Sequence, residues 1–79
     1  MLKKLIKSGS ILLGNTQYKT NIFMTTNIAN QVSYSYEVIF DSYDRIIIDD
    51  DDLSRLAMKI HQVVPVAHRS RVVAKMDME

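Results

Sequence analysis

The stretch that decides the fold is VSYSYEVIF, residues 32–40, in which large and small side chains alternate. The large side chains that occupy every second position are Val32, Tyr34, Tyr36, Val38 and Phe40. Two serines and a glutamate lie between the first four of them. A period of two places successive side chains on opposite faces of a β-strand. The pattern therefore predicts a strand with one apolar face and one small, polar face.

The flanking segments extend this strand into a sheet. Residues 41–44 (DSYD) predict a turn, because Asp and Ser bond their own backbone there, and residues 45–48 predict a short returning strand. Residues 18–26, rich in Thr, Ile, Phe and Tyr, favour a further strand, and residues 27–30 a loop. Residues 1–7 fit either a short helix or a first strand, which would turn at residues 8–10 into residues 11–13. Gly14-Asn15 suits a type II′ hairpin turn.

The segment after the predicted sheet has helical spacing. From about residue 51 to residue 64, apolar side chains fall within one arc of a helical wheel, spanning roughly 120° at 3.6 residues per turn. Aspartates at its start can cap free N–H groups, and Pro65 is expected to stop or kink it. Residues 66–79 are ambiguous between a last strand from Arg71, which Val72-Val73 favours, and a second short helix from Val66.

These elements predict one small α+β domain over residues 1–79: an antiparallel meander of three to four strands packed on one face by a single amphipathic helix. Alternation favours the face that carries the tyrosines as the one the helix covers. If the helix packs on the opposite face instead, Tyr34 and Tyr36 become an exposed binding surface, since tyrosine is favoured at interfaces.

Composition excludes several classes of function. The 79 residues contain no cysteine, which removes disulfides, zinc ribbons and thiol nucleophiles. The two glycines are isolated, and no phosphate-binding loop, nucleophile elbow or catalytic triad is present. We therefore expect no enzymatic activity, no catalytic residue and no cofactor. No apolar run approaches the ~20 residues of a membrane span and no signal peptide is visible, so a cytoplasmic location is expected.

The aspartates and histidines are the candidate metal ligands, and neither set has the required spacing. Asp49, Asp50, Asp51 and Asp52 lack the glycine and closing glutamate of a calcium loop. His61 and His68 are seven residues apart, not the four that one helix face requires. We predict no metal site. A cluster that also includes Asp41 and Asp44 is better interpreted as a helix start with an acidic rim that meets a basic partner.

Charge is strongly segregated behind a net charge of +1. Residues 1–36 contain four lysines and no acid, residues 37–52 hold seven of the nine acids, and residues 53–76 are again basic. This order predicts an acidic pole and a basic pole. Within the last segment, a compact basic stretch could clamp phosphates; its residues are His68, Arg69, Arg71 and Lys75.

A non-catalytic interaction protein is the function we expect. It would bind another protein through the acidic residues or through the tyrosines of the sheet. In size and style the chain resembles small viral proteins of phages and other mobile elements that bind and inhibit a host protein. The alternative is a small nucleic-acid-binding regulator that uses the basic stretch, to which Lys3, Lys4 and Lys7 could add. We also expect a homodimer, formed through an open sheet edge or through the N-terminal apolar residues Leu2, Leu5, Ile6 and Ile11–Leu13.

Overall fold

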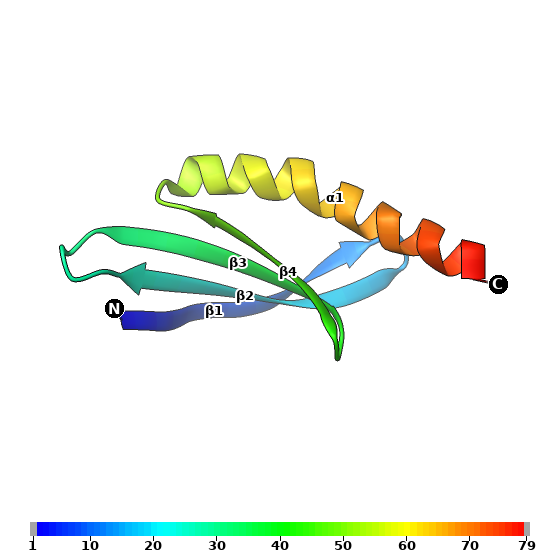
Figure 1. Ribbon diagram of the computed structural model, residues 1–79, viewed down its shortest axis with the longest axis horizontal. Coiled ribbons are helices and arrows are strands. Elements are labelled where there is room, and N and C mark those ends of the chain that lie inside the picture. The colour runs from blue at the N-terminus through cyan, green and yellow to red at the C-terminus, as the bar shows by residue number, and fades with distance from the viewer. Residues whose placement is uncertain (1, 79) are drawn as a thin grey trace.

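The computed structural model describes the backbone of residues 2–78 and the side chains of residues 2–76. Four antiparallel strands form one sheet in the order β1-β2-β3-β4, and a single helix follows them (Figure 1). The α+β meander predicted from the sequence is confirmed. Residues 2–13 form one continuous strand, so the predicted turn at residues 8–10 is wrong. The elements are β1 (Leu2–Leu13), β2 (Thr16–Thr26), β3 (Val32–Asp41), β4 (Asp44–Asp50) and α1 (Leu53–Met78).

The helix is longer than the sequence predicts. It begins at Leu53 and continues through Pro65 to Met78, so the predicted end at residue 64 and the predicted C-terminal strand from Arg71 are both wrong. Pro65 cannot donate a backbone hydrogen bond, which normally penalises a helix interior. Contacts with the sheet hold the second half of the helix in place. Arg71 pairs with Asp44 of β4, and the His68 ring packs edge-on against Tyr18 of β2.

The core lies between α1 and the tyrosine-bearing face of the sheet. Val38, Ile48, Leu56 and Val64 are buried, and they come from β3, β4 and α1. Tyr34, Tyr36 and Phe40 are half-buried against this cluster, together with Ile46 and Ile60. The helix therefore covers the face that alternation favours. The predicted tyrosine binding surface depended on the helix covering the opposite face. Because α1 covers the tyrosine-bearing face, Tyr34 and Tyr36 pack against the core.

Two tight connections follow local sequence. A type II′ turn requires a positive φ at its first central residue and a negative φ at its second. Gly14 has a φ of 61°, and Asn15 has no positive φ, so the connection between β1 and β2 meets this requirement. In the β2–β3 connection, Asn27 Oδ1 accepts hydrogen bonds from the backbone N–H groups of Ala29 and Gln31. Asn30, with a φ of 61°, completes this loop, since Asn tolerates the left-handed region better than most residues. Both turns fix antiparallel neighbours in the sheet.

The molecule is elongated, with extents of 50 × 24 × 18 Å. Its accessible surface is 5989 Å². A compact monomer of 9.1 kDa is expected to expose about 4,900 Å². The difference arises where the sheet extends beyond the helix: residues 2–10 of β1 are all exposed, whereas α1 packs mainly on β4 and β3 (Figure 1). One side of the sheet and one of its edges are left uncovered.

Candidate protein-binding surface

The face of the sheet opposite α1, called the open face below, carries the side chains that alternate with the core residues. The pairing register arranges them in rows that cross all four strands. One row contains Ser8, Asn21, Glu37 and Ile47. The next row towards the start of β1 contains Leu5, Phe23, Ser35 and Asp49. Since none of these residues faces the helix, they form a continuous uncovered surface of the sheet.

A hydrogen-bonded ladder of polar side chains links the four strands on the open face. Ser8 Oγ donates to Asn21 Oδ1 at 2.8 Å, and Asn21 Nδ2 donates to Glu37 Oε1 at 2.9 Å. Arg45 Nη1 donates to the other carboxylate oxygen of Glu37 at 2.9 Å. Glu37 is 6% exposed. Both carboxylate oxygens are therefore satisfied, and the ladder fixes the strands relative to one another.

The electrostatics of Glu37 follow from these contacts. The hydrogen bond from Asn21 holds the pKa of the Glu37 carboxyl below its usual range, although burial opposes this. The Arg45 guanidinium and the more distant Lys3 ammonium also favour the charged form. Glu37 is thus a carboxylate that the fold keeps ionised, and its hydrogen bonds engage it within the sheet.

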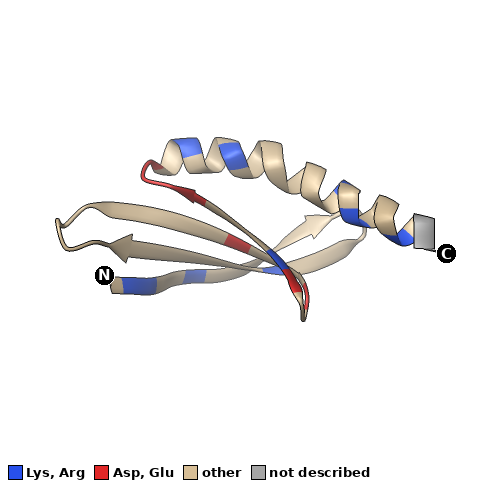
Figure 2. Cartoon of the chain, in the orientation of Figure 1, with Lys and Arg blue, Asp and Glu red and all other residues tan. Residues whose placement is uncertain are grey.

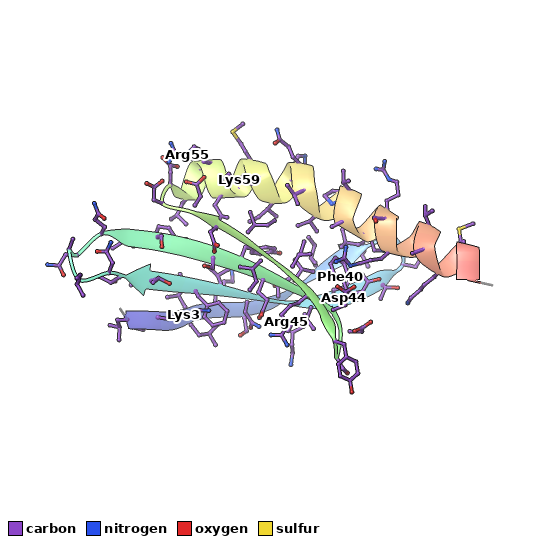
Figure 3. The ribbon with its side chains drawn as sticks, viewed as in Figure 1. Lys3, Phe40, Asp44, Arg45, Arg55 and Lys59 are labelled. Atoms are coloured by element: carbon purple, nitrogen blue, oxygen red, sulfur yellow. The ribbon has the colours of Figure 1, made fainter. Side chains whose placement is uncertain are left out.

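Apolar side chains surround this polar ladder. Leu5, Leu12 and Ile47 are each at least half exposed, and Phe23 and Ile39 are partly exposed. Lys3 Nζ lies 4.5 Å from the centroid of the Phe23 ring, a cation–π contact at the margin of the face (Figure 3). An apolar surface with a few fixed polar groups is the composition that protein interfaces favour at their centre.

The six aspartates proposed as a protein-binding acidic pole are mostly engaged within the chain. Asp50 pairs with Lys59 at 2.8 Å and with Arg55 at 3.1 Å, and its side chain is only 5% exposed (Figure 3). The hydrogen bond from Lys59 is the main cause that holds the pKa of the Asp50 carboxyl well below its usual range. Asp51 also contacts Arg55. The predicted acidic pole is therefore partly neutralised by the first turns of α1.

The other aspartates have local structural roles. Asp52 caps α1, because its Oδ1 accepts from the backbone N–H groups of Ser54 and Arg55. Asp41 accepts from the backbone N–H of Tyr43 in the β3–β4 turn, and Asp49 accepts from the Ser35 hydroxyl on the open face. Asp44 accepts two hydrogen bonds from Arg71, at 2.6 and 2.9 Å, which lower the pKa of its carboxyl.

The basic stretch of α1 is divided between packing and solvent. The Arg71 guanidinium, besides pairing with Asp44, lies 4.4 Å from the centroid of the Phe40 ring. His68 is half-buried against Tyr18, whereas Arg69 and Lys75 are exposed. Figure 2 shows the acidic end of β4 beside the basic first turns of α1, with a second acidic group at the β3–β4 turn. Basic residues of α1 therefore form ion pairs with acidic residues of β4, and the predicted poles are not separate. Of the four proposed phosphate ligands, only Arg69 and Lys75 are not engaged with Asp44 or Tyr18.

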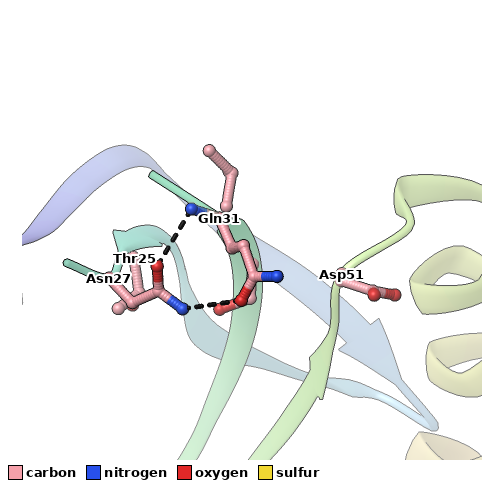
Figure 4. A pocket seen from close by; sticks show the side chains of 6 residues that line it. Thr25, Asn27, Gln31 and Asp51 are labelled. Atoms are coloured by element: carbon pink, nitrogen blue, oxygen red, sulfur yellow. Dashed lines mark hydrogen bonds between the residues drawn. The ribbon is translucent and has the colours of Figure 1, made fainter. Parts of the chain in front are cut away.

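A depression of about 540 Å³ lies between the β2–β3 loop and the start of α1 (Figure 4). Thr25, Asn27, Gln31 and Asp51 are among its lining residues, and Asn27 Nδ2 donates to Gln31 Oε1 at 2.9 Å. No histidine lines it, because His61 and His68 lie further along α1. Within residues 2–76 no group of three or more His, Asp or Glu side chains is placed to hold a metal ion.

The open face includes residues that sequence reasoning did not single out. Asn21 and Phe23 lie in β2, where apolar side chains occur on both faces, with Phe23 on the open side and Ile22 on the covered one. Alternation alone therefore does not separate the two sides of this strand. The only signal was the set of polar residues that alternates with the large side chains of β3. That set predicted a polar face, and its members are Ser33, Ser35 and Glu37.

Comparisons with other proteins add no relationship: no protein-family model matches the chain, and neither curated proteins nor solved structures yield a significant match. Across residues 2–78, α1 is the only helix, and it lacks the length of apolar sequence that crossing a bilayer demands.

Proposed function

We propose that this chain is a non-catalytic protein-binding domain, and that the open face of its sheet is the binding surface. The observation that carries the proposal is the combination on one face of exposed apolar side chains with a polar ladder that holds all four strands in register. A pre-organised surface of this kind loses little conformational entropy when a partner binds.

The proposed partner is a protein with an apolar patch bordered by both charges. Lys3 and Lys19 lie on the β1–β2 side of the open face. On the β4 side, Arg45 pairs with Glu37, which leaves Asp49 as the acidic group there. This arrangement orients a partner whose own charges run in the opposite sense. Inhibition of that partner, as in the analogy with phage proteins, would follow if the bound surface overlaps the partner's functional site.

The nucleic-acid alternative has weaker support. Two of its four residues, His68 and Arg71, are held against Tyr18 and Asp44. Arg69 and Lys75 alone offer too few phosphate contacts to produce the steep salt dependence that such binding requires. We therefore place this function second.

The test uses two charge-introducing variants at residues of similar exposure. Ile47, on the open face, is 53% exposed, and Met58, on the outer side of α1, is 61% exposed. Ile47→Lys and Met58→Lys thus add the same charge at positions where neither disturbs the core. Each protein would be immobilised and used to capture partners from the native host, and each captured protein would then be purified and its affinity measured by calorimetry.

We expect one defined partner that binds the wild-type chain and Met58→Lys equally, with at least a tenfold weaker affinity for Ile47→Lys. Equal affinity for Ile47→Lys, or a selective loss with Met58→Lys, would place the binding surface elsewhere and contradict the proposal. Recovery of nucleic acid alone, with binding that weakens steeply as salt rises, would support the regulator instead.

A further inference from the structure

The two edges of the sheet differ in how well they are protected. β1 and β4 are the edge strands. β4 has seven residues, and α1 packs on it: Lys59 Nζ donates to the backbone carbonyl of Asp49 at 3.1 Å and also pairs with the Asp50 carboxylate. Covering an edge with a helix is a common means of preventing strand addition. The β4 edge is therefore protected over its acidic end.

The β1 edge has no such cover. β1 has twelve residues, and its residues 2–10 are all exposed. Its apolar side chains are unusually accessible for a monomer: Leu2 is 70% exposed, Leu12 62%, Leu5 50% and Ile6 46%. Long, exposed apolar edges readily pair with another strand. Two features of β1 oppose such pairing: its lysines, and the bulge between Leu5 and Lys7.

The position of the lysines allows β1 to pair with itself. Lys3, Lys4 and Lys7 all lie in the first half of the strand, and the second half, residues 8–13, carries no charge. In an antiparallel pair about a two-fold axis, the lysine half of each copy faces the uncharged half of the other. With Gly9 on the axis, Lys7 lies opposite Ile11 and Leu5 lies opposite Leu12, allowing for the extra residue Ile6 that bulges between Leu5 and Lys7. No lysine then faces another lysine.

The exposed area also fits a second copy. The chain exposes roughly 1,100 Å² more than a compact monomer of its mass. A standard interface buries about 800 Å² on each partner. Because α1 protects the β4 edge over its acidic end, self-association through the β1 edge is expected to close as a dimer about a two-fold axis and not to extend into a fibre.

We propose that two copies of this chain pair through β1, antiparallel about a two-fold axis near Gly9, to form a continuous eight-stranded sheet. Both helices then cover the same side of the sheet, and the two open faces join into one surface. This proposal stands independently of the protein-binding function, since the β1 edge and the open face are different surfaces.

The absence of cysteine provides a direct test. In an antiparallel pair, residues directly opposite each other have Cα atoms about 4.5–5.5 Å apart, which lies within the range of a disulfide. Gly9→Cys should therefore link two copies under mild oxidation. The fold has room for this side chain, because a Cβ at Gly9 would lie 3.6 Å from Thr20 Oγ1, an ordinary contact. Ser42→Cys, in the exposed β3–β4 turn, is the matched control.

We expect the wild-type chain at tens of micromolar to show the mass of a dimer by light scattering. Gly9→Cys should oxidise to a covalent dimer at least tenfold faster than Ser42→Cys. Gly9→Lys, which brings two ammonium groups together on the axis, should be monomeric with an unchanged circular dichroism spectrum, and Ser42→Lys should remain dimeric. A monomeric wild-type mass, or a dimer that Gly9→Lys leaves intact, would overturn the proposal.

Discussion

The β1–β2 hairpin and the unit formed by β3, β4 and α1 are stabilised in different ways. The buried apolar residues come from the second unit alone, and within residues 2–76 so do all the ion pairs. The hairpin is attached through its ladder with β3 and through half-buried Ile11, Leu13 and Tyr18. The comparison shows that one part of the chain supplies most of the stability, while the other presents an edge and a face to solvent.

The largest expected effect is from truncation of a core side chain. Leu56 is 3% exposed and lies between α1 and the sheet. Leu56→Ala should lower the free energy of unfolding by about 2–5 kcal/mol, through lost burial and a remaining cavity. Leu5→Ala in β1, a half-exposed leucine, should lower it by less than about 1 kcal/mol. Urea unfolding at a fixed, low protein concentration measures both free energies of unfolding. Equal decreases for Leu56→Ala and Leu5→Ala would contradict the division into two units.

Removal of the buried carboxylate should have the next largest effect. Glu37→Ala leaves Asn21 Nδ2 and Arg45 Nη1 without their acceptor, and we expect a loss of about 1–3 kcal/mol. Asp49→Ala, on the same face but exposed, is the control and should change stability by less than about 0.5 kcal/mol. Thermal unfolding distinguishes them. If Glu37→Ala left the free energy of unfolding unchanged, water would be replacing the hydrogen bonds of the ladder with no loss of stability.

Acidification should weaken the β3–β4–α1 unit. The pKa values of the Glu37, Asp44 and Asp50 carboxyls are lowered in the folded chain by Asn21, Arg71 and Lys59 respectively. Because the folded pKa values lie below the unfolded ones, their contribution is present above about pH 4.5 and is lost as the pH falls through the folded values. The double variant Asp44→Asn/Asp50→Asn should be less stable than the wild type at pH 7, and the difference should shrink towards pH 2. A constant difference in urea midpoints across that range would show that these pairs do not stabilise the fold.

The smallest effect compares the two glycines. Gly14 has a positive φ, which strains a residue with a side chain, so Gly14→Ala should cost about 1 kcal/mol even though a Cβ there would make only an ordinary 3.5 Å contact with His68. Gly9 lies in β1 without a positive φ, and Gly9→Ala should be neutral or slightly stabilising. Differential scanning calorimetry resolves the two. A destabilising Gly9→Ala would indicate that this position is more constrained than the exposed edge implies.

The sequence predicts those features that depend on neighbouring residues. The alternation in β3, the Gly14-Asn15 turn and the aspartate cap of α1 each depend on a few adjacent side chains, and the structure contains all three. The helix beyond Pro65 could not be predicted, because the contacts that hold it join Arg71 to Asp44, 27 residues apart. The ladder through Asn21 and Glu37 joins residues that are 13 and 16 positions apart in the sequence. It depends on the pairing register of the strands, which local spacing does not define.

The position of α1 after all four strands determines when the core can close during synthesis. Val38 and Ile48 emerge from the ribosome before Leu56 and Val64, which bury them. At 5–20 residues per second, translating the 26 residues of α1 takes roughly 1–5 s. During that interval the nascent sheet exposes both of its faces and the β1 edge. Slow codons within residues 53–78 would lengthen this interval, and the yield of native protein would then depend on chaperones that bind exposed strands.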